Sequence, residues 1–351
     1  MKNNIKLLFQ NLFQSVFKDW NRNYKHQKGF KSLIKCIIST LRIVNKNRNK
    51  KIFNNKIEFL TFSVIPGLTS FWISHISSLK NIKIASTTIG DCSGGLNIEN
   101  NKKINVIPIL NFEHGYKIDL FIKYICKSEF IVICDDDIFF VDEEPLEWAK
   151  EEFRKKPNLV AVSLFPRPSS NKRVNNYIKL FKDHSSKLVI LEKLMGSYCL
   201  IIRKKIWVKE NISFQIKKPK NWEKVGNYFD TADFANLKLI ELGYEIVIAP
   251  QKIQKKLICF TSMSLWGLRI QETLGNISKV IRPRPNEYEK AYRTAVALLS
   301  FNKYLNCSNS LNTTVKEDYI MRTIKICKSK INDKTRKEID EEVINKFIKL
   351  V

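Results

Sequence analysis

The chain has 351 residues, 44% of them hydrophobic and 27% charged, which is typical of a globular protein and excludes a disordered or fibrous one. Its formal net charge is +27, but the bases are spread along the chain without a nucleic-acid-binding module, so we expect no nucleic acid partner. No apolar run approaches the roughly 18 residues of a membrane-spanning helix, and we expect no secretory signal. The eight cysteines form no CxxC pair, which favours a reduced, cytoplasmic protein.

Residues 1–50 predict a basic, amphipathic helical extension. Apolar side chains recur at helical spacing over 5–17 and again over 30–41. The flanking cations are Lys2, Lys6, Lys18, Lys31, Lys35 and Arg42. Two interpretations stay open: peripheral contact with the inner face of a membrane, or packing of both helices on the main domain.

Strand and helix patterns alternate from residue 55 to residue 280. The expected strands cover residues 58–66, 82–86, 104–109, 130–134, 159–165, 197–203 and 244–249. The expected helices cover residues 68–79, a stretch after Gly115, 142–156 and 230–243. This alternation indicates an α/β domain with a mainly parallel sheet flanked by helices. Residues 281–351 predict a helical accessory region.

Three carboxylates directly follow the apolar run Phe130–Cys134. The run predicts a strand buried on both faces, and such a strand cannot hold Asp135, Asp136 and Asp137 without compensation. In an extended chain, Asp135 and Asp137 would point to the same side. Oxygen ligands on one side suit Mg²⁺ or Mn²⁺. A turn or a helix cap is the alternative, because Asp is favoured in both.

A second acidic pair, Asp230 and Asp233, stands at the start of the predicted helix over 230–243. The two residues are one helical turn apart, so their carboxylates would face the same side. One of them would cap the helix, which would leave the other as a candidate general base. Helix capping by both acids remains the alternative.

The order of these elements resembles the GT-A fold glycosyltransferases, and within them the glycosyltransferase family 2-like group, over residues 58–250. The stretches that carry the resemblance are Thr61–Thr69, Asp91 after the second strand, His114–Asp119 leading to Asp135–Asp137, and Gly196–Arg203 followed by Asp230–Asp233 and Gly243. It implies a Rossmann-like GT-A domain over residues 55–280, with helical N- and C-terminal extensions.

The resemblance also implies roles for single residues. Asp135 and Asp137 would hold the metal, and Asp233, or else Asp230, would be the catalytic base. The implied donor-binding residues are Pro66, Asp91, His114, Asp119 and Asp136. Structural roles stay open for three of these: a turn for Asp91, a solvated first helical turn for Asp119, and a cap or loop for His114.

Two features depart from the family pattern. The family often has Glu-Asp-x-Asp where this chain has Phe229-Asp230-Thr-Ala-Asp233, which leaves the choice of base open. Many metal-dependent members add a C-terminal histidine ligand, and no histidine follows His184 here. The metal would then depend on the aspartates and the diphosphate.

We therefore expect an enzyme that transfers one sugar, hexosyltransferase-like, from a UDP- or GDP-linked donor with inversion and with Mn²⁺ or Mg²⁺. The acceptor would be a glycan, a lipid-linked or a small molecule, as in polysaccharide biosynthesis. One alternative is a catalytically degenerate GT-A domain that serves as a binding or scaffold subunit. Another is a sugar-phosphate nucleotidyltransferase, which is disfavoured because Ile65–Ser70 lacks a basic residue and a Gly-rich phosphate loop.

Overall fold

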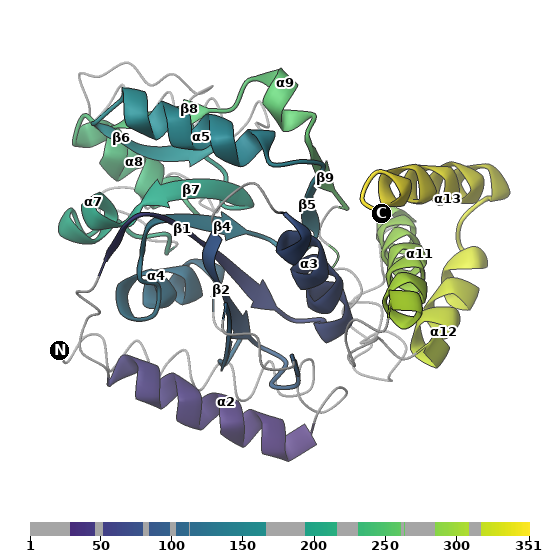
Figure 1. Cartoon of the computed structure of the whole chain (residues 1–351). Helices are drawn as coiled ribbons and strands as arrows, with labels where there is room; N and C mark the ends of the chain where they lie inside the picture. Colours follow the sequence, from purple (N-terminus) through teal and green to yellow (C-terminus); the bar gives the residue numbers. More distant parts are fainter. Residues whose placement is uncertain are drawn as a thin grey trace, which may run out of the picture.

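The computed structural model describes residues 29–45, 52–79, 84–98, 103–111, 113–165, 194–215, 231–260, 263, 285–308 and 317–351. The helix expected over 5–17 and the candidate base Asp230 lie outside these residues. Figure 1 shows a sheet-centred body with a group of C-terminal helices on one side.

A seven-stranded sheet forms the centre of the molecule, in the order β3–β2–β1–β4–β7–β6–β8. Its strands are β1 Phe53–Ser63, β2 Ile84–Asp91, β3 Ile104–Pro108, β4 Ser128–Cys134, β6 Leu159–Ser163, β7 Cys199–Arg203 and β8 Glu245–Ile248. Strand β7 runs antiparallel to both of its neighbours, whereas the other neighbouring pairs are parallel. The mainly parallel sheet and the α/β class expected from the sequence are confirmed.

The sheet has a separate apolar core on each face. One face is covered by α3 Pro66–Ser78, α5 Glu144–Lys155 and α9 Gln251–Gln254, and the other by α2 Gly29–Val44, α4 His114–Tyr124, α7 Lys204–Lys209 and α8 Asp233–Glu241. Side chains alternate along a strand, so in β1 Phe59 enters the first core and Leu60 the second. The result is a three-layered domain.

Three C-terminal helices, α11 Pro285–Ser308, α12 Glu317–Lys328 and α13 Asp333–Ile348, pack beside α3 (Figure 1). The contact centres on Phe71 of α3, whose ring stacks on that of Phe301 with 4.0 Å between centroids and 8° between planes. Phe347 of α13 joins the same aromatic group. These three helices share the core of the first sheet face.

Two local details differ from the sequence expectation. Strand β2 continues to Asp91 instead of ending at Ser86, because it pairs with β1 up to Ser63. Helix α8 begins after Ala232, which has a left-handed backbone (φ 78°) and no capping side-chain hydrogen bond. Gly243 follows the helix with φ 75°, which is the conformation expected of a glycine after a helix end.

Candidate functional site

The three adjacent parallel strands β2, β1 and β4 end at the same edge of the sheet. Ser63 at the end of β1 is opposite Asp91 at the end of β2, and β4 ends beside them at Cys134. The loop before β7 reaches this edge too, since the amide of Asp135 donates to the carbonyl of Tyr198 at 2.8 Å. Ligands of open α/β sheets bind at this kind of edge, so the loops here form the candidate site.

The three aspartates after β4 lie in a tight turn. The carbonyl of Asp135 accepts a 3.1 Å hydrogen bond from the amide of Ile138, where the short strand β5 Ile138–Phe140 begins. The sequence analysis expected an extended chain in which Asp135 and Asp137 point to the same side, and the turn shows that the chain is not extended here. In a turn, successive side chains diverge, and the structure gives each carboxylate its own surroundings.

Asp136 and Asp137 point into the protein. Asp136 is 3% exposed and accepts a 2.6 Å hydrogen bond from the hydroxyl of Thr69 in α3. Asp137 is 6% exposed, and its Oδ2 accepts from the amide of Met263 at 3.0 Å. Its carbonyl accepts from the amide of Phe260, next to β9 Leu257–Cys259, which pairs with β5. Both acids thus position the turn.

Asp135 differs from its two neighbours because 37% of its side chain is exposed. Within the described residues its carboxylate makes no hydrogen bond, and Nε2 of His114 lies 3.9 Å from its Oδ1. Burial raises the pKa of Asp135 well above its usual value, and the negative charges of Asp137 and Asp136 raise it further. A cation bound at Asp135 would relieve this repulsion.

His114 is the first residue of α4, but it does not cap that helix. Glu113 is the N-cap, and its carboxylate accepts from the amides of Gly115 and Tyr116. Burial and the nearby ammonium of Lys117 lower the pKa of His114 to about 3. The imidazole is therefore neutral near pH 7 and can offer one N–H donor without adding charge.

Lys117 is a site residue that the sequence analysis missed. Its side chain is 4% exposed, and its Nζ donates to Oδ1 of Asn111 at 2.6 Å and contacts Sγ of Cys92 at 3.5 Å. The ammonium also lies 5.1 Å from the ring centre of Phe62. The positive charge of Lys117 lowers the pKa of Asp135. In the sequence, its position one helical turn after His114 was the feature that could have identified it as a site residue.

Asp91 holds its own loop together. Its side chain is fully buried, and its Oδ1 accepts from the amides of Ser93 and Gly94 and from the Ser93 hydroxyl. Its Oδ2 accepts from the amide of Leu96 at 2.9 Å. Of the two interpretations left open for Asp91, this geometry is that of the turn-former.

Asp119 joins α4 to the segment after α7. It is 3% exposed, so the solvated position considered for it is wrong. Its two oxygens accept from the hydroxyl of Ser213 at 2.5 Å and the amide of Phe214 at 3.0 Å. Gly115 allows this close approach, because a Cβ there would lie 2.1 Å from the carbonyl oxygen of Phe214. Asp119 thus fixes the chain that crosses the start of α4.

Pro66 and Asp233 occupy helix starts. Pro66 begins α3, where its missing N–H costs no hydrogen bond. Asp233 begins α8 and is fully buried. Near it, the side chain of Asn236 exchanges two 3.0 Å hydrogen bonds with the backbone of Met195, which lies just before β7. These bonds place the start of α8 beside the loop that contacts Asp135.

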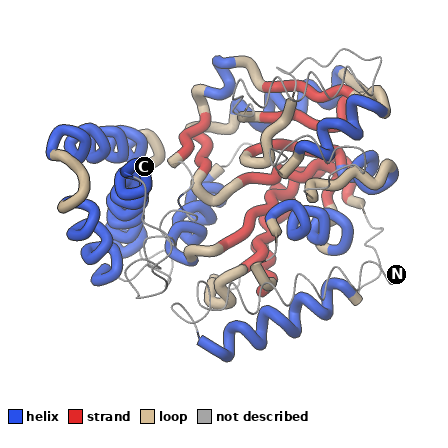
Figure 2. Tube along the Cα trace, turned by 180° about the vertical axis from the view of Figure 1, so that it is seen from behind, coloured by secondary structure: helices blue, strands red, loops and turns tan. Residues whose placement is uncertain are grey.

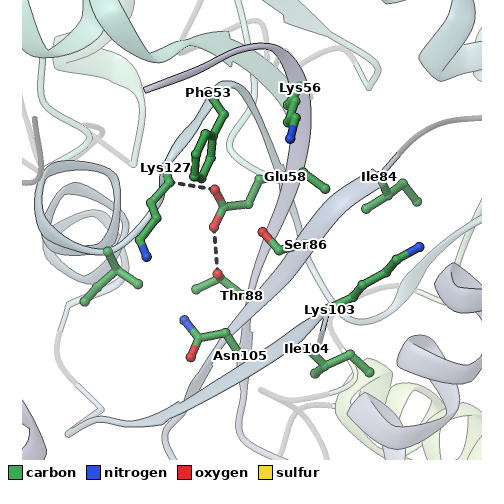
Figure 3. A pocket seen from close by; sticks show the side chains of 12 residues that line it. Phe53, Lys56, Glu58, Ile84, Ser86, Thr88, Lys103, Ile104, Asn105 and Lys127 are labelled. Atoms are coloured by element: carbon green, nitrogen blue, oxygen red, sulfur yellow. Dashed lines mark hydrogen bonds between the residues drawn. The ribbon is translucent and has the colours of Figure 1, made fainter. Parts of the chain in front are cut away.

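A cavity of about 590 Å³ lies at the opposite edge of the sheet, among the amino-terminal ends of β1, β2 and β3 (Figure 3). Its centre contains the buried carboxylate of Glu58, which accepts from the Thr88 hydroxyl and from the amides of Lys127 and Ser128. The carboxyl ends of the strands are at the other edge. This cavity is therefore separate from the candidate site.

Within the described ranges, no three His, Cys, Asp or Glu side chains converge in a geometry suited to a metal ion. Mg²⁺ commonly takes only one or two protein carboxylates and completes its shell with phosphate oxygens and water. Asp135, which is half-buried at this edge and feels the negative charge of Asp137, fits that mode of binding.

No protein-family model and no curated protein sequence matches this chain. Among solved structures it is similar to glucosyl-3-phosphoglycerate synthase from Mycobacterium tuberculosis in complex with Mn²⁺, UDP-glucose and glycerol 3-phosphate, with 11% identity and a TM-score of 0.32. That match covers 43% of this chain and 57% of the other.

A second structure of that synthase, with Mn²⁺, UDP and phosphoglyceric acid, matches with 11% identity over 64% of this chain and 80% of the other, with a TM-score of 0.37. An active-site mutant of LgtC matches with 11% identity over 57% of this chain and 74% of the other, with a TM-score of 0.34. Similarities this low carry no argument about the activity of this chain, which has to be argued from its own residues.

Proposed function

We propose that this chain is a GT-A glycosyltransferase that moves one sugar from a nucleotide-sugar donor to an acceptor hydroxyl, with a divalent cation. The observation that supports it is the half-buried carboxylate of Asp135, which reaches solvent at the carboxyl edge of the central sheet beside two buried acids. Three adjacent carboxylates favour a cation, and a cation at that edge is suited to a nucleoside diphosphate.

In this proposal Asp135 holds the cation, Mn²⁺ or Mg²⁺, and the buried carboxylate of Asp137 adds negative charge behind it. When bound, the cation would neutralise the charge that grows on the departing diphosphate. Asp136 keeps the turn in place through Thr69. The position of Asp135 is thus set before a ligand arrives.

His114 and Lys117 would act on the phosphates of the donor. The neutral imidazole of His114 can donate an N–H to a phosphate oxygen. The buried ammonium of Lys117 is held by Asn111, and it offsets part of the negative charge that two phosphates would bring to an acidic edge. Together they would favour a UDP- or GDP-linked donor over a neutral sugar.

The acceptor hydroxyl needs a base if the anomeric centre is inverted, and we assign this role to Asp233. It is the first residue of α8, where the helix dipole favours a negative charge. Asp230 is the other candidate and lies outside the described residues. A glycan, lipid-linked or small hydroxyl acceptor would approach from the loop before β7.

Thermal unfolding with added nucleotides tests the proposal. UDP, GDP and CDP would each be added with Mn²⁺, with Mg²⁺ or with EDTA, because a ligand that binds only the folded state raises the midpoint. We expect a metal-dependent rise with one nucleotide, lost in Asp135→Asn. The matched control is Asp142→Asn, since the side chain of Asp142 is also 37% exposed but pairs with Lys256 away from the site.

The control variant should keep the shift. A folded wild-type protein that shows no shift with any nucleotide would contradict the transferase and favour a binding or scaffold subunit. A shift that survives EDTA and Asp135→Asn would mean that the nucleotide binds without the acidic turn.

A further inference from the structure

Helix α2, Gly29–Val44, lies along the outside of the sheet domain, next to β3 and α4 (Figure 1, Figure 2). Residues three and four apart share one side of a helix. The buried residues on the side that packs on the domain are Leu33, Cys36, Thr40 and Ile43, and Ile37 and Val44 are partly buried against the same core. The hydroxyl of Thr40 donates to the carbonyl of Cys36 and accepts from the amide of Leu110, which fixes the helix to the loop after β3.

A second apolar stripe on α2 faces solvent. Its members and their exposed fractions are Ile34 39%, Ile38 45% and Leu41 39%. They follow the same three- and four-residue spacing as the packed side but lie on a different side of the helix. Packing on the domain therefore leaves part of the apolar surface of α2 exposed, and a row of large apolar side chains that reach water marks an interaction surface.

The charges on α2 are all positive. Lys31, Lys35 and Arg42 are exposed, and the helix contains no Asp or Glu. Long basic side chains next to an apolar stripe can reach lipid phosphates while the apolar side chains enter the headgroup region. Among the described helices, none combines the length and sustained hydropathy of a transmembrane span.

We propose that α2 docks this protein on the surface of an anionic lipid bilayer, with its exposed apolar stripe in the interface and its cations on the phosphates. A second copy of the chain is a less suitable occupant. A two-fold contact through this face would place Lys31, Lys35 and Arg42 near their own symmetry mates, in a chain whose net charge is already +27. An anionic bilayer matches both the stripe and its cations. This inference does not depend on the proposed sugar transfer.

Vesicle co-sedimentation of the full chain tests the inference. The vesicles are phosphatidylcholine alone or phosphatidylcholine with phosphatidylglycerol, at low and high salt. The variant Ile34→Ser with Ile38→Ser should bind anionic vesicles about tenfold or more weakly, because two apolar side chains no longer enter the interface. Both residues are exposed, so its melting temperature should remain that of the wild type.

The matched control is Ile344→Ser with Ile348→Ser on α13. It removes the same residue type at the same spacing and at similar exposure, 49% and 63%. This control should bind anionic vesicles like the wild type. Binding of the wild type should weaken in high salt and on neutral vesicles, because the cations contribute.

Three results would overturn the inference. The wild type could fail to bind anionic vesicles. The two serine pairs could weaken binding equally, which would mean non-specific adsorption. Light scattering could instead show a dimer that the Ile34→Ser, Ile38→Ser variant loses, in which case the stripe is a subunit interface.

Discussion

The hydroxyl of Thr69 donates a 2.6 Å hydrogen bond to the buried carboxylate of Asp136. Thr69 is in the first turns of α3, after β1, and Asp136 is in the turn after β4. This one bond therefore joins the loops of two neighbouring strands at the carboxyl edge of the sheet. The oxygen of Ser63 lies 2.7 Å from the Thr69 hydroxyl and extends the link to the end of β1.

Thr69→Val should destabilise the protein by about 1.5–3 kcal/mol, because it removes a hydrogen bond between a hydroxyl and a buried carboxylate. Chemical denaturation measures the change. Ser78→Ala on the same helix also removes a hydroxyl, but an exposed one, and should change stability by less than about 0.5 kcal/mol. Equal changes in the free energy of unfolding for the two variants would show that the Thr69–Asp136 hydrogen bond stabilises the protein no more than an exposed one.

Asp135→Asn should raise the melting temperature of the ligand-free protein at neutral pH. The pKa of Asp135 is raised in the folded state, first by burial and then by Asp137 and Asp136. When the pKa of a carboxyl group is higher in the folded state than in the unfolded state, its ionised form destabilises the folded protein at neutral pH. The uncharged amide of asparagine removes this destabilisation. A lowered melting temperature would mean that the Asp135 carboxylate stabilises the ligand-free protein, which would contradict this prediction.

Lys117→Met should move metal-dependent nucleotide binding to higher pH. The Lys117 ammonium lowers the pKa of Asp135, so its loss lets that carboxylate hold its proton to a higher pH. A cation binds only the ionised form. Calorimetry from mildly acidic to neutral pH gives the pH at which the affinity has half of its maximal value. Lys123→Met on the same helix is the control. If Lys117→Met leaves this pH unchanged, Lys117 does not influence cation binding at Asp135.

Glu342 on α13 should make the packing of α13 on α11 sensitive to acid. Burial raises its pKa, but hydrogen bonds and charge from Lys346 and Arg293 outweigh burial and lower it. Because the pKa of Glu342 is lower in the folded state, its ionised form stabilises the folded protein at pH values above the pKa of the unfolded chain, near 4.5. This stabilisation is lost as the pH falls through the pKa of the folded state.

The melting temperature of Glu342→Gln compared with wild type over this range isolates the Glu342 contribution. The wild type should be the more stable protein at neutral pH, and the difference should shrink in acid. A difference that does not change with pH would mean that Glu342 contributes packing and no charge.

The fold was predictable because its signals are local. Apolar runs such as Phe130–Cys134 predict strands from their own residues, and Gly243 predicts the end of α8 from its backbone preference. The loop that Asp91 organises is also local, since all its hydrogen-bond donors come from the next five residues.

The geometry of the acidic turn was not predictable, because distant residues determine it. Asp136 turns toward Thr69 and Asp137 toward Met263, and neither partner is near them in the sequence. The place of Lys117 in the site was not predicted for a related reason. A lysine in an amphipathic helix normally lies in solvent, and its burial depends on the loops of β2 and β3 that supply Cys92 and Asn111.

The decisive assay for sugar transfer measures the release of nucleoside diphosphate from a panel of UDP-, GDP- and CDP-linked sugars. We expect slow, metal-dependent release from one donor, lost in Asp135→Asn and in Asp137→Asn and kept in Asp142→Asn, with all proteins folded. Release that is equal in wild type and Asp135→Asn, or no release from any donor although a nucleotide binds, would contradict sugar transfer at this edge of the sheet.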